Sequence, residues 1–186
     1  MPPSVATDPN PVPLCVDLDG TVIRTDMLWE SLVQLLRHNP LFALLVPLWF
    51  LRGRACLKEK VAVRTEVDVT ALPYHEPFVE FLQAERRTGR ILLLVSAADY
   101  RLAKRVADHL SLFNEVLASN GKLNLRGKIK AAKLVERFGE HGFDYAGNSS
   151  VDLAVWPHAR QGIIVGGSVN LARKARRCAH ITQIFD

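Results

Sequence analysis

The chain has 186 residues, and its 24 Lys and Arg outnumber its 19 Asp and Glu, which gives a formal net charge of +5. With 48% apolar and 23% charged residues, the composition excludes wholesale disorder and indicates one folded domain of ordinary size. So small a surplus of positive charge does not indicate a nucleic-acid partner, and none is expected. The three cysteines include no Cys-x-x-Cys pair, which excludes a disulfide framework and indicates the reduced thiols of a cytoplasmic protein.

The first part of the chain predicts a leader, one strand and a set of helices. Residues 1–13 contain five prolines and no apolar signal segment, so we expect a disordered leader there. The apolar run 14–16, followed by two acids and Gly20, predicts a buried strand that enters a tight turn. Apolar residues at helical spacing predict a helix over 26–37, and only helical patterns follow as far as residue 74.

Strands and helices alternate through the remainder of the chain. We expect helices over 76–87, 99–110 and 128–138 and from Ser168 onward, and strands over 91–95, 115–118, 143–146, 163–165 and 181–185. This alternation predicts an α/β fold with a parallel sheet and helices on both of its faces. The core domain would comprise residues 14–26 and 75–186, with residues 27–74 as an inserted helical cap.

An uninterrupted apolar run covers residues 41–51. As a helix it would span only about 16 Å, whereas the hydrocarbon core of a bilayer is about 30 Å thick. The run therefore does not predict a membrane-spanning helix. It either forms the core of the cap or lies against a membrane or a membrane protein, in which case residues 41–64 would place the protein peripherally at the inner face of the membrane. The basic residues of 52–64 would suit anionic lipid head groups.

Polar residues gather where the predicted strands end, which is where open parallel sheets bind their ligands. The carboxylates of Asp17 and Asp19, two residues apart, repel each other unless a cation lies between them or one of them is protonated. Because Mg²⁺ prefers oxygen ligands and is usually held by a few carboxylates together with phosphate, a magnesium and phosphate site is expected there. The residues that would converge on it are Asp17, Asp19, Ser96, Lys130, Asn148 and Asp152.

These residues lie in motifs that resemble those of the haloacid dehalogenase (HAD) superfamily. The sequence Asp-Leu-Asp-Gly-Thr at 17–21 is similar to its first motif, and Ser96, Lys130 and residues 147–152 resemble the second, third and fourth. In more detail, residues 28–31, 47–54 and 143–149 resemble the soluble HAD-like domain that precedes UbiA-type prenyltransferases in bacterial membrane proteins. The resemblance covers residues 14–186 and implies a Rossmann-like HAD fold.

The resemblance also implies an activity. It suggests a Mg²⁺-dependent phosphatase that hydrolyses a phosphomonoester through an aspartyl-phosphate, on a small phosphorylated metabolite or a polyprenyl-linked phosphosugar. Asp17 would be the nucleophile, and Asp19 the general acid and base. Thr21, Ser96 and Lys130 would hold the phosphoryl oxygens. Mg²⁺ would be held by Asp17, Asp19, Asn148 and Asp152.

Some positions leave alternatives open. Lys133 lies one turn from Lys130 and could share its face, whereas Lys128 is expected at the surface. The fourth motif of the family usually begins Gly-Asp, but here Asn148 follows the glycine. An amide carries no full charge, so weaker metal binding is expected, and Asp152 would compensate directly or through water. The alternative function is a catalytically weak or inactive phosphate-binding module that partners a membrane prenyltransferase. Asp19 disfavours a dehalogenase proper, and a phosphomutase stays open.

Overall fold

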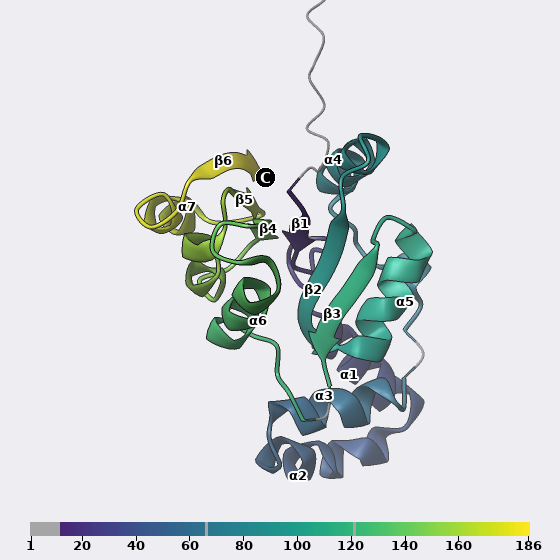
Figure 1. The fold of residues 1–186 in the computed structure, drawn as a ribbon. Coiled ribbons are helices and arrows are strands. Elements are labelled where there is room, and N and C mark those ends of the chain that lie inside the picture. Colours follow the sequence, from purple (N-terminus) through teal and green to yellow (C-terminus); the bar gives the residue numbers. More distant parts are fainter. Residues whose placement is uncertain (1–11, 66, 121) are drawn as a thin grey trace, which may run out of the picture.

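The sheet of this protein has six strands, all of them parallel, in the order β3-β2-β1-β4-β5-β6. The computed structural model describes residues 12–65, 67–120 and 122–186, so nearly all of the expected leader lies outside the described residues. The α/β fold predicted from the alternation of elements is confirmed (Figure 1). The strands are β1 (Leu14–Val16), β2 (Leu92–Asp99), β3 (Glu115–Ser119), β4 (Asp144–Gly147), β5 (Gly162–Val165) and β6 (Ile181–Phe185).

Helices cover both faces of the sheet because alternate strand residues point to opposite sides. On one face, Leu14 and Val16 of β1 belong to a core cluster that includes side chains of α4 (Glu76–Arg87) and α5 (Tyr100–Leu110). On the other face, Cys15 belongs to a cluster with side chains of α6 (Lys128–Phe138) and α7 (Val169–Ala175). Two short 3₁₀ helices, η3 (Asp152–Ala154) and η4 (Trp156–His158), follow β4.

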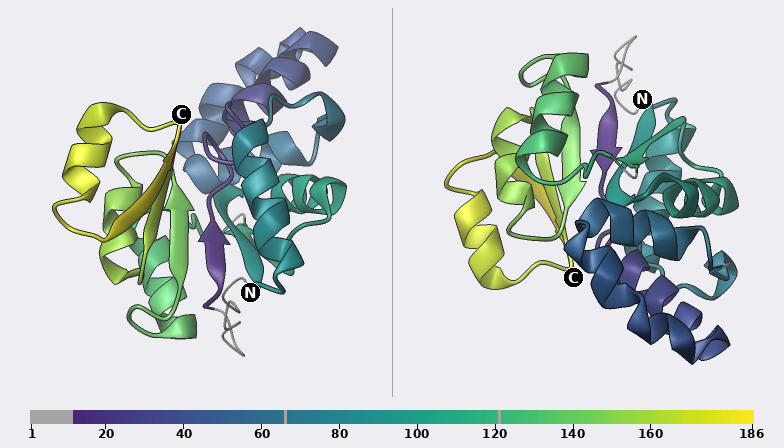
Figure 2. Two further views of the ribbon diagram at one scale, coloured as in Figure 1. Left: turned by 90° about the horizontal axis from the view of Figure 1, so that it is seen from above. Right: turned by 90° about the horizontal axis from the view of Figure 1, so that it is seen from below.

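In the described residues between β1 and α4, all the regular elements are helices. This segment comprises α1 (Met27–His38), the 3₁₀ helix η1 (Pro40–Leu44), α2 (Val46–Leu51), α3 (Arg54–Ala62) and the 3₁₀ helix η2 (Val69–Ala71). Leu35, Trp49, Leu57 and Val61 form a separate small core within it. These cap helices lie at the end of the sheet toward which β2 and β3 point (Figure 1), and the view from below shows them in the foreground (Figure 2).

Where the cap leaves and rejoins the core, the two chain segments run side by side. Ile23 and Tyr74 form an antiparallel bridge. Two backbone hydrogen bonds flank it, one from the Arg24 N–H to the Pro73 carbonyl oxygen and one from the His75 N–H to the Val22 carbonyl oxygen. The cap is therefore attached to the core through two adjacent connections.

The observed elements differ from the predicted ones at two places that matter for the site. β2 continues past Ser96 to Asp99, because Ser96 pairs with Ala118 and, after an irregularity, Asp99 pairs with Ser119 of β3. The side chain of Asp99 then caps α5 by accepting a hydrogen bond from the Arg101 N–H. The apolar run 41–51 is divided between η1 and α2, and no helix in the described part of the chain is long and apolar enough to cross a membrane.

Candidate active site

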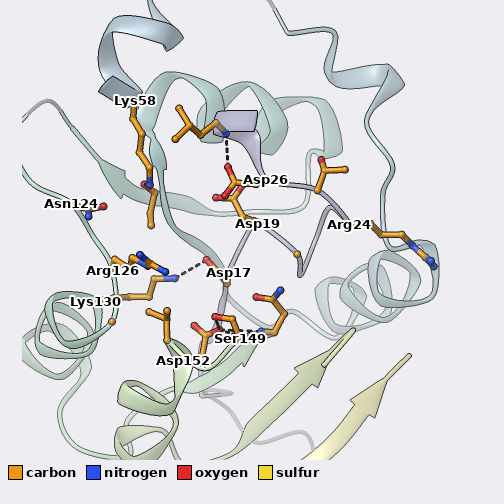
Figure 3. Close-up of a pocket in the computed structure, with 17 residues that line it drawn as sticks. Asp17, Asp19, Arg24, Asp26, Lys58, Asn124, Arg126, Lys130, Ser149 and Asp152 are labelled. Carbon is orange, nitrogen blue, oxygen red and sulfur yellow. Dashed lines mark hydrogen bonds and ion pairs between the residues drawn. The ribbon is translucent and has the colours of Figure 1, made fainter. Parts of the chain in front are cut away.

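A pocket of about 380 Å³ lies at the carboxyl end of the sheet. Its wall is formed by the loop after β1, the loop before α6, the loop after β4 and side chains of the cap helices α1 and α3 (Figure 3). Five of the predicted site residues line it: Asp17, Asp19, Lys130, Asn148 and Asp152. The structure therefore brings residues from distant parts of the sequence to the expected end of the sheet.

Asp17 follows β1 directly and is paired with a buried lysine. The Lys130 Nζ donates a hydrogen bond to Asp17 Oδ1 over 2.7 Å, and both side chains are almost fully buried. Burial raises the pKa of Asp17 and Asp152 raises it further, whereas Lys130 lowers it. Lys130 is thus the group that favours the ionised carboxylate. Lys128 and Lys133 are exposed, and Lys133 instead pairs with Glu136 on the surface.

Asp19 lies in the turn that follows β1. Its Oδ1 accepts a hydrogen bond of 2.8 Å from the Met27 N–H at the start of α1. Burial, together with the negative charges of Asp17 and Asp26, raises the pKa of Asp19 to about 7. A carboxyl group with a pKa near neutrality can both donate and accept a proton, which suits it to general acid and base catalysis.

Asp152 is buried and its oxygens are engaged by protein donors. Oδ2 accepts hydrogen bonds from the Asn148 N–H, the Ser149 N–H and the Ser149 Oγ, while Oδ1 accepts one of 2.7 Å from the Tyr145 hydroxyl. The same hydroxyl accepts a hydrogen bond of 2.9 Å from Lys130 Nζ. Asp152 therefore fixes the loop after β4 and, through Tyr145, the lysine that contacts Asp17. This favours an indirect role at a metal over direct ligation.

Asn148 packs directly over Gly20. A Cβ atom at Gly20 would lie 1.9 Å from the Asn148 side-chain nitrogen, and the Gly20 φ angle of +75° is one that L-residues rarely adopt. Two structural features thus require a glycine at position 20. The turn needs its positive φ angle, and the side-chain amide of Asn148 occupies the space that a Cβ atom would fill. The contact places the Asn148 amide beside the turn that carries Asp17 and Asp19.

Two predicted phosphate-binding residues are absent from the pocket wall. Ser96 is fully buried, and its hydroxyl accepts a hydrogen bond of 2.9 Å from the Ala98 N–H; the neighbouring Ala97 lines the pocket. Thr21 is also fully buried, and within the described chain its hydroxyl has no hydrogen-bond partner. The strand ended later than expected, so Ser96 lies within β2 rather than at its end. Phosphate binding by these two hydroxyls stays a prediction.

Several residues of the pocket could not be found by motif. Lys58 of α3 reaches the Ala97 carbonyl oxygen and lines the pocket, although its place in a basic run suggested a surface position. Arg126 and Asn124, from the loop before α6, also line the pocket (Figure 3). The packing of α3 on the core brings Lys58 to this pocket, the path of the loop before α6 brings Asn124 and Arg126, and no local pattern in the sequence encodes either.

The residues at this site fit a magnesium ion. Burial and the negative charge of Asp17 raise the pKa of Asp19, and a divalent cation beside the two carboxyl groups would offset both effects. Among the described residues, no group of three His, Cys, Asp or Glu side chains could hold a metal alone. Asp17, Asp19 and Asn148 line the pocket and carry oxygen donors of the kind that Mg²⁺ prefers, together with several waters.

The chain belongs to the haloacid dehalogenase-like hydrolases, whose family description matches residues 14–155. It is 40% identical over 166 residues to the uncharacterized protein y4nM of Sinorhizobium fredii (strain NBRC 101917 / NGR234), a match that covers 89% of this chain and 32% of that protein. The chain thus spans about a third of the length of this curated relative.

Solved structures show the same fold at low sequence identity. A protein of unknown function from Bordetella pertussis Tohama I superposes with a TM-score of 0.70 at 14% identity, covering 95% of this chain and 99% of that one. The structure of a phospho-aspartyl intermediate analogue of phosphoserine phosphatase superposes with a TM-score of 0.61 at 17% identity, covering 95% of this chain and 94% of that one. The predicted HAD-like fold is therefore confirmed.

Proposed function

We propose that this protein is a Mg²⁺-dependent phosphatase that hydrolyses a phosphomonoester through an aspartyl-phosphate on Asp17. The observation that carries the proposal is the pairing of Asp17 with Lys130 beside Asp19, a carboxyl group whose pKa is raised to about 7. Burial raises the pKa of Asp17 and Lys130 opposes that effect, so the lysine favours the carboxylate form of Asp17; at Asp19, burial and the charges of Asp17 and Asp26 favour the protonated form. Environments that separate the protonation of two acids are typical of a nucleophile and a general acid.

In the first half-reaction, Asp17 forms a bond to phosphorus. Lys130 holds Oδ1, so we assign the attack to Oδ2. As the bond from Oδ2 to phosphorus forms, the bond from phosphorus to the ester oxygen breaks. Asp19 gives its proton to that leaving oxygen, which departs as an alcohol. Lys130 stabilises the negative charge on the phosphoryl oxygens as it develops.

In the second half-reaction, Asp19 acts as a base. Its carboxylate removes a proton from water, the water oxygen bonds to phosphorus, and the bond from phosphorus to Asp17 breaks. Inorganic phosphate leaves, and both aspartates return to their starting protonation states. A bound Mg²⁺ ion would neutralise charge on the phosphoryl group, held by Asp17, the Asp19 carbonyl oxygen and Asn148. The Met27 backbone N–H donates a hydrogen bond to Asp19 Oδ1 and so holds that carboxyl group in place at the site.

The pocket supports a substrate with a polar, anionic head. Lys58, Arg126 and Lys130 contribute positive charge on the side of the pocket across from Asp19 and Asp26 (Figure 3). We propose a small phosphorylated metabolite or the phosphosugar end of a polyprenyl-linked compound. The exposed apolar residues of the cap favour the second of these. A substrate in a membrane would give those residues an apolar surface to contact, whereas a substrate free in solution would not.

Release of phosphate from p-nitrophenyl phosphate tests the proposal. We expect turnover with Mg²⁺, its loss when the metal is removed with EDTA, and its return when Mg²⁺ is added back. A gain in mass of one phosphoryl group on the acid-quenched protein would identify the covalent step. Absence of Mg²⁺-dependent turnover on p-nitrophenyl phosphate and on a panel of phosphorylated metabolites would instead favour a non-catalytic phosphate-binding module.

Replacing the amide at the fourth motif should strengthen metal binding. Asn148→Asp adds a negative charge beside the Gly20 turn, so we expect the Mg²⁺ concentration for half-maximal activity to fall about tenfold and turnover to rise. Titration of activity with Mg²⁺ measures both quantities. Asn170→Asp, the same change at an exposed position on α7, is the matched control and should change neither. Unchanged metal affinity and turnover in Asn148→Asp would show that this position does not contact the metal.

A further inference from the structure

The tip of the cap carries an exposed apolar surface. Six of the large apolar residues in 41–51 are exposed, and four of them, Leu41, Leu44, Leu48 and Leu51, recur at helical spacing along η1 and α2. Their exposed fractions are 69%, 77%, 48% and 82%. We call these four residues the outer stripe. Scattered exposed leucines are ordinary, but a contiguous group of this kind marks a contact surface.

The outer stripe is the unburied side of a segment that is itself well packed. Trp49 is buried in the cap core with Leu35, Leu57 and Val61, and Phe42 and Val46 pack against that cluster. The rings of Phe42 and Trp49 lie 5.9 Å apart. One side of the segment 41–51 thus packs on the cap core, and the other side is exposed to solvent. Since a helix that is apolar all round is normally buried on all sides, the outer stripe needs a second apolar environment.

The charged residues that flank the outer stripe in the sequence have a single sign. No Asp or Glu occurs between Glu30 and Glu59. Exposed cations stand on either side of the segment in the sequence: Arg37 precedes it, and Arg52 and Arg64 follow. The Arg64 guanidinium lies 5.2 Å from the centre of the Trp49 ring, so it is held beside α2. An apolar strip edged by arginines is complementary to a surface that is apolar inside and negatively charged outside.

We propose that the cap tip docks on a membrane that contains anionic lipids, with the outer stripe entering the boundary between head groups and acyl chains. A second copy of the chain fits less well, because a symmetric contact would bring the same arginines toward each other. A protein partner also fits less well, since protein interfaces normally contain hydrogen bonds and the only polar side-chain group in 41–51 is on the buried Trp49. The proposal does not depend on catalysis.

Docking in this way would bring the pocket close to the lipid. α1 and α3, which pack around α2 in the cap core, also supply Leu28 and Lys58 to the wall of the pocket. η1 and α2 lie at the outer end of the molecule in Figure 1, on the side of the sheet to which the strands point. A phosphorylated head group at the bilayer surface would therefore meet the pocket from the same side as the cap.

Flotation with lipid vesicles tests the proposal. The 186-residue chain should float with vesicles of phosphatidylcholine and phosphatidylglycerol, and bind more weakly to vesicles of phosphatidylcholine alone. Leu44→Glu with Leu48→Glu should weaken binding to the mixed vesicles at least about tenfold, because both leucines would leave the lipid. Val169→Glu is the matched control: Val169 is 87% exposed on α7, and its replacement should leave binding unchanged. Arg52→Glu should abolish most of the preference for the anionic vesicles.

Three results would overturn the proposal. They are failure of the unmodified chain to float with the mixed vesicles, equal binding by the Leu44→Glu, Leu48→Glu variant, and equal loss of binding in Val169→Glu. Circular dichroism and the thermal unfolding midpoint establish that each variant is folded. Sedimentation velocity without lipid separates self-association: a dimer that dissociates in the Leu44→Glu, Leu48→Glu variant, without vesicle binding by the parent chain, would assign the outer stripe to a second copy.

Discussion

Asp17→Asn should lower the rate of phosphate release at least about a thousandfold, because the amide cannot form the bond to phosphorus that begins the proposed reaction. The change is nearly isosteric and keeps an oxygen within reach of Lys130 Nζ, which lies 2.7 Å from Asp17 Oδ1. The effect is therefore expected in turnover rather than in the fold. Steady-state hydrolysis of p-nitrophenyl phosphate and the mass of the acid-quenched protein measure the two consequences, slower turnover and no covalent phosphoryl group.

The matched control for this experiment is Asp108→Asn. Asp108 is exposed on α5, where it pairs with Lys104 one turn away, and surface pairs of this kind contribute about 1 kcal/mol or less. Its replacement should leave both turnover and the covalent intermediate intact. Turnover in Asp17→Asn within a few-fold of the parent chain would contradict the assignment of Asp17 as nucleophile.

Lys130→Met should impair both activity and stability. Without the lysine the pKa of Asp17 rises further, since Lys130 is the main group that lowers it. A larger fraction of Asp17 is then protonated and unreactive at neutral pH, and the phosphoryl oxygens lose a positive partner. We expect turnover to fall about 10²- to 10³-fold. Removing one member of a buried ion pair costs about 3–5 kcal/mol of unfolding free energy.

The stability loss in Lys130→Met should depend on pH in a defined direction. A carboxyl group whose pKa is raised in the folded state stabilises the fold while it is protonated, and this contribution is lost as pH rises through the folded pKa. The loss should therefore be smaller in acid than at neutral pH, as measured by urea unfolding. Lys133→Met, which breaks only the surface pair with Glu136, is the matched control and should change stability by less than about 1 kcal/mol.

A double replacement, Asp17→Asn with Lys130→Met, distinguishes loss of the interaction between these two side chains from a general disruption of the fold. Because each residue is the other's buried partner, the combined loss of stability should be smaller than the sum of the single losses, by about 0.5–3 kcal/mol. Strict additivity would show that the two side chains do not stabilise each other in solution.

The sequence alone predicts the sheet and much of the pocket because both depend on local patterns. A strand that ends in Asp17 and Asp19 at a glycine turn is readable from apolar periodicity and turn chemistry. Alternation of elements then requires parallel strands, and parallel strands bring their carboxyl ends together. That reasoning places Asn148 and Lys130 near Asp17, where the structure has them. Helical spacing left Lys130 and Lys133 as alternatives, and only packing on the sheet shows which one is buried.

Positions that depend on long-range packing could not be predicted. The end of β2 is set by its pairing with β3, so Ser96 was expected at a strand end and lies inside the strand. Lys58 belongs to a basic run that looks like a solvated surface, yet the packing of α3 aims it at Ala97. The apolar run 41–51 could equally have been cap core or contact surface, and the structure divides it between the two because only one side of η1 and α2 faces the cap core.

The bridge between Ile23 and Tyr74 holds the two connections between core and cap side by side. The cap is therefore inserted at a single place in the core. The entropy of closing a loop grows only slowly with its length, and here the closure is already made by the core's own hydrogen bonds. The segment between these two positions could therefore differ in size while the contact between Asp17 and Lys130, both of which belong to the core, stayed as it is. The same pair of core residues can in this way be combined with different cap segments, which would change the substrate that is bound or the surface on which the protein docks.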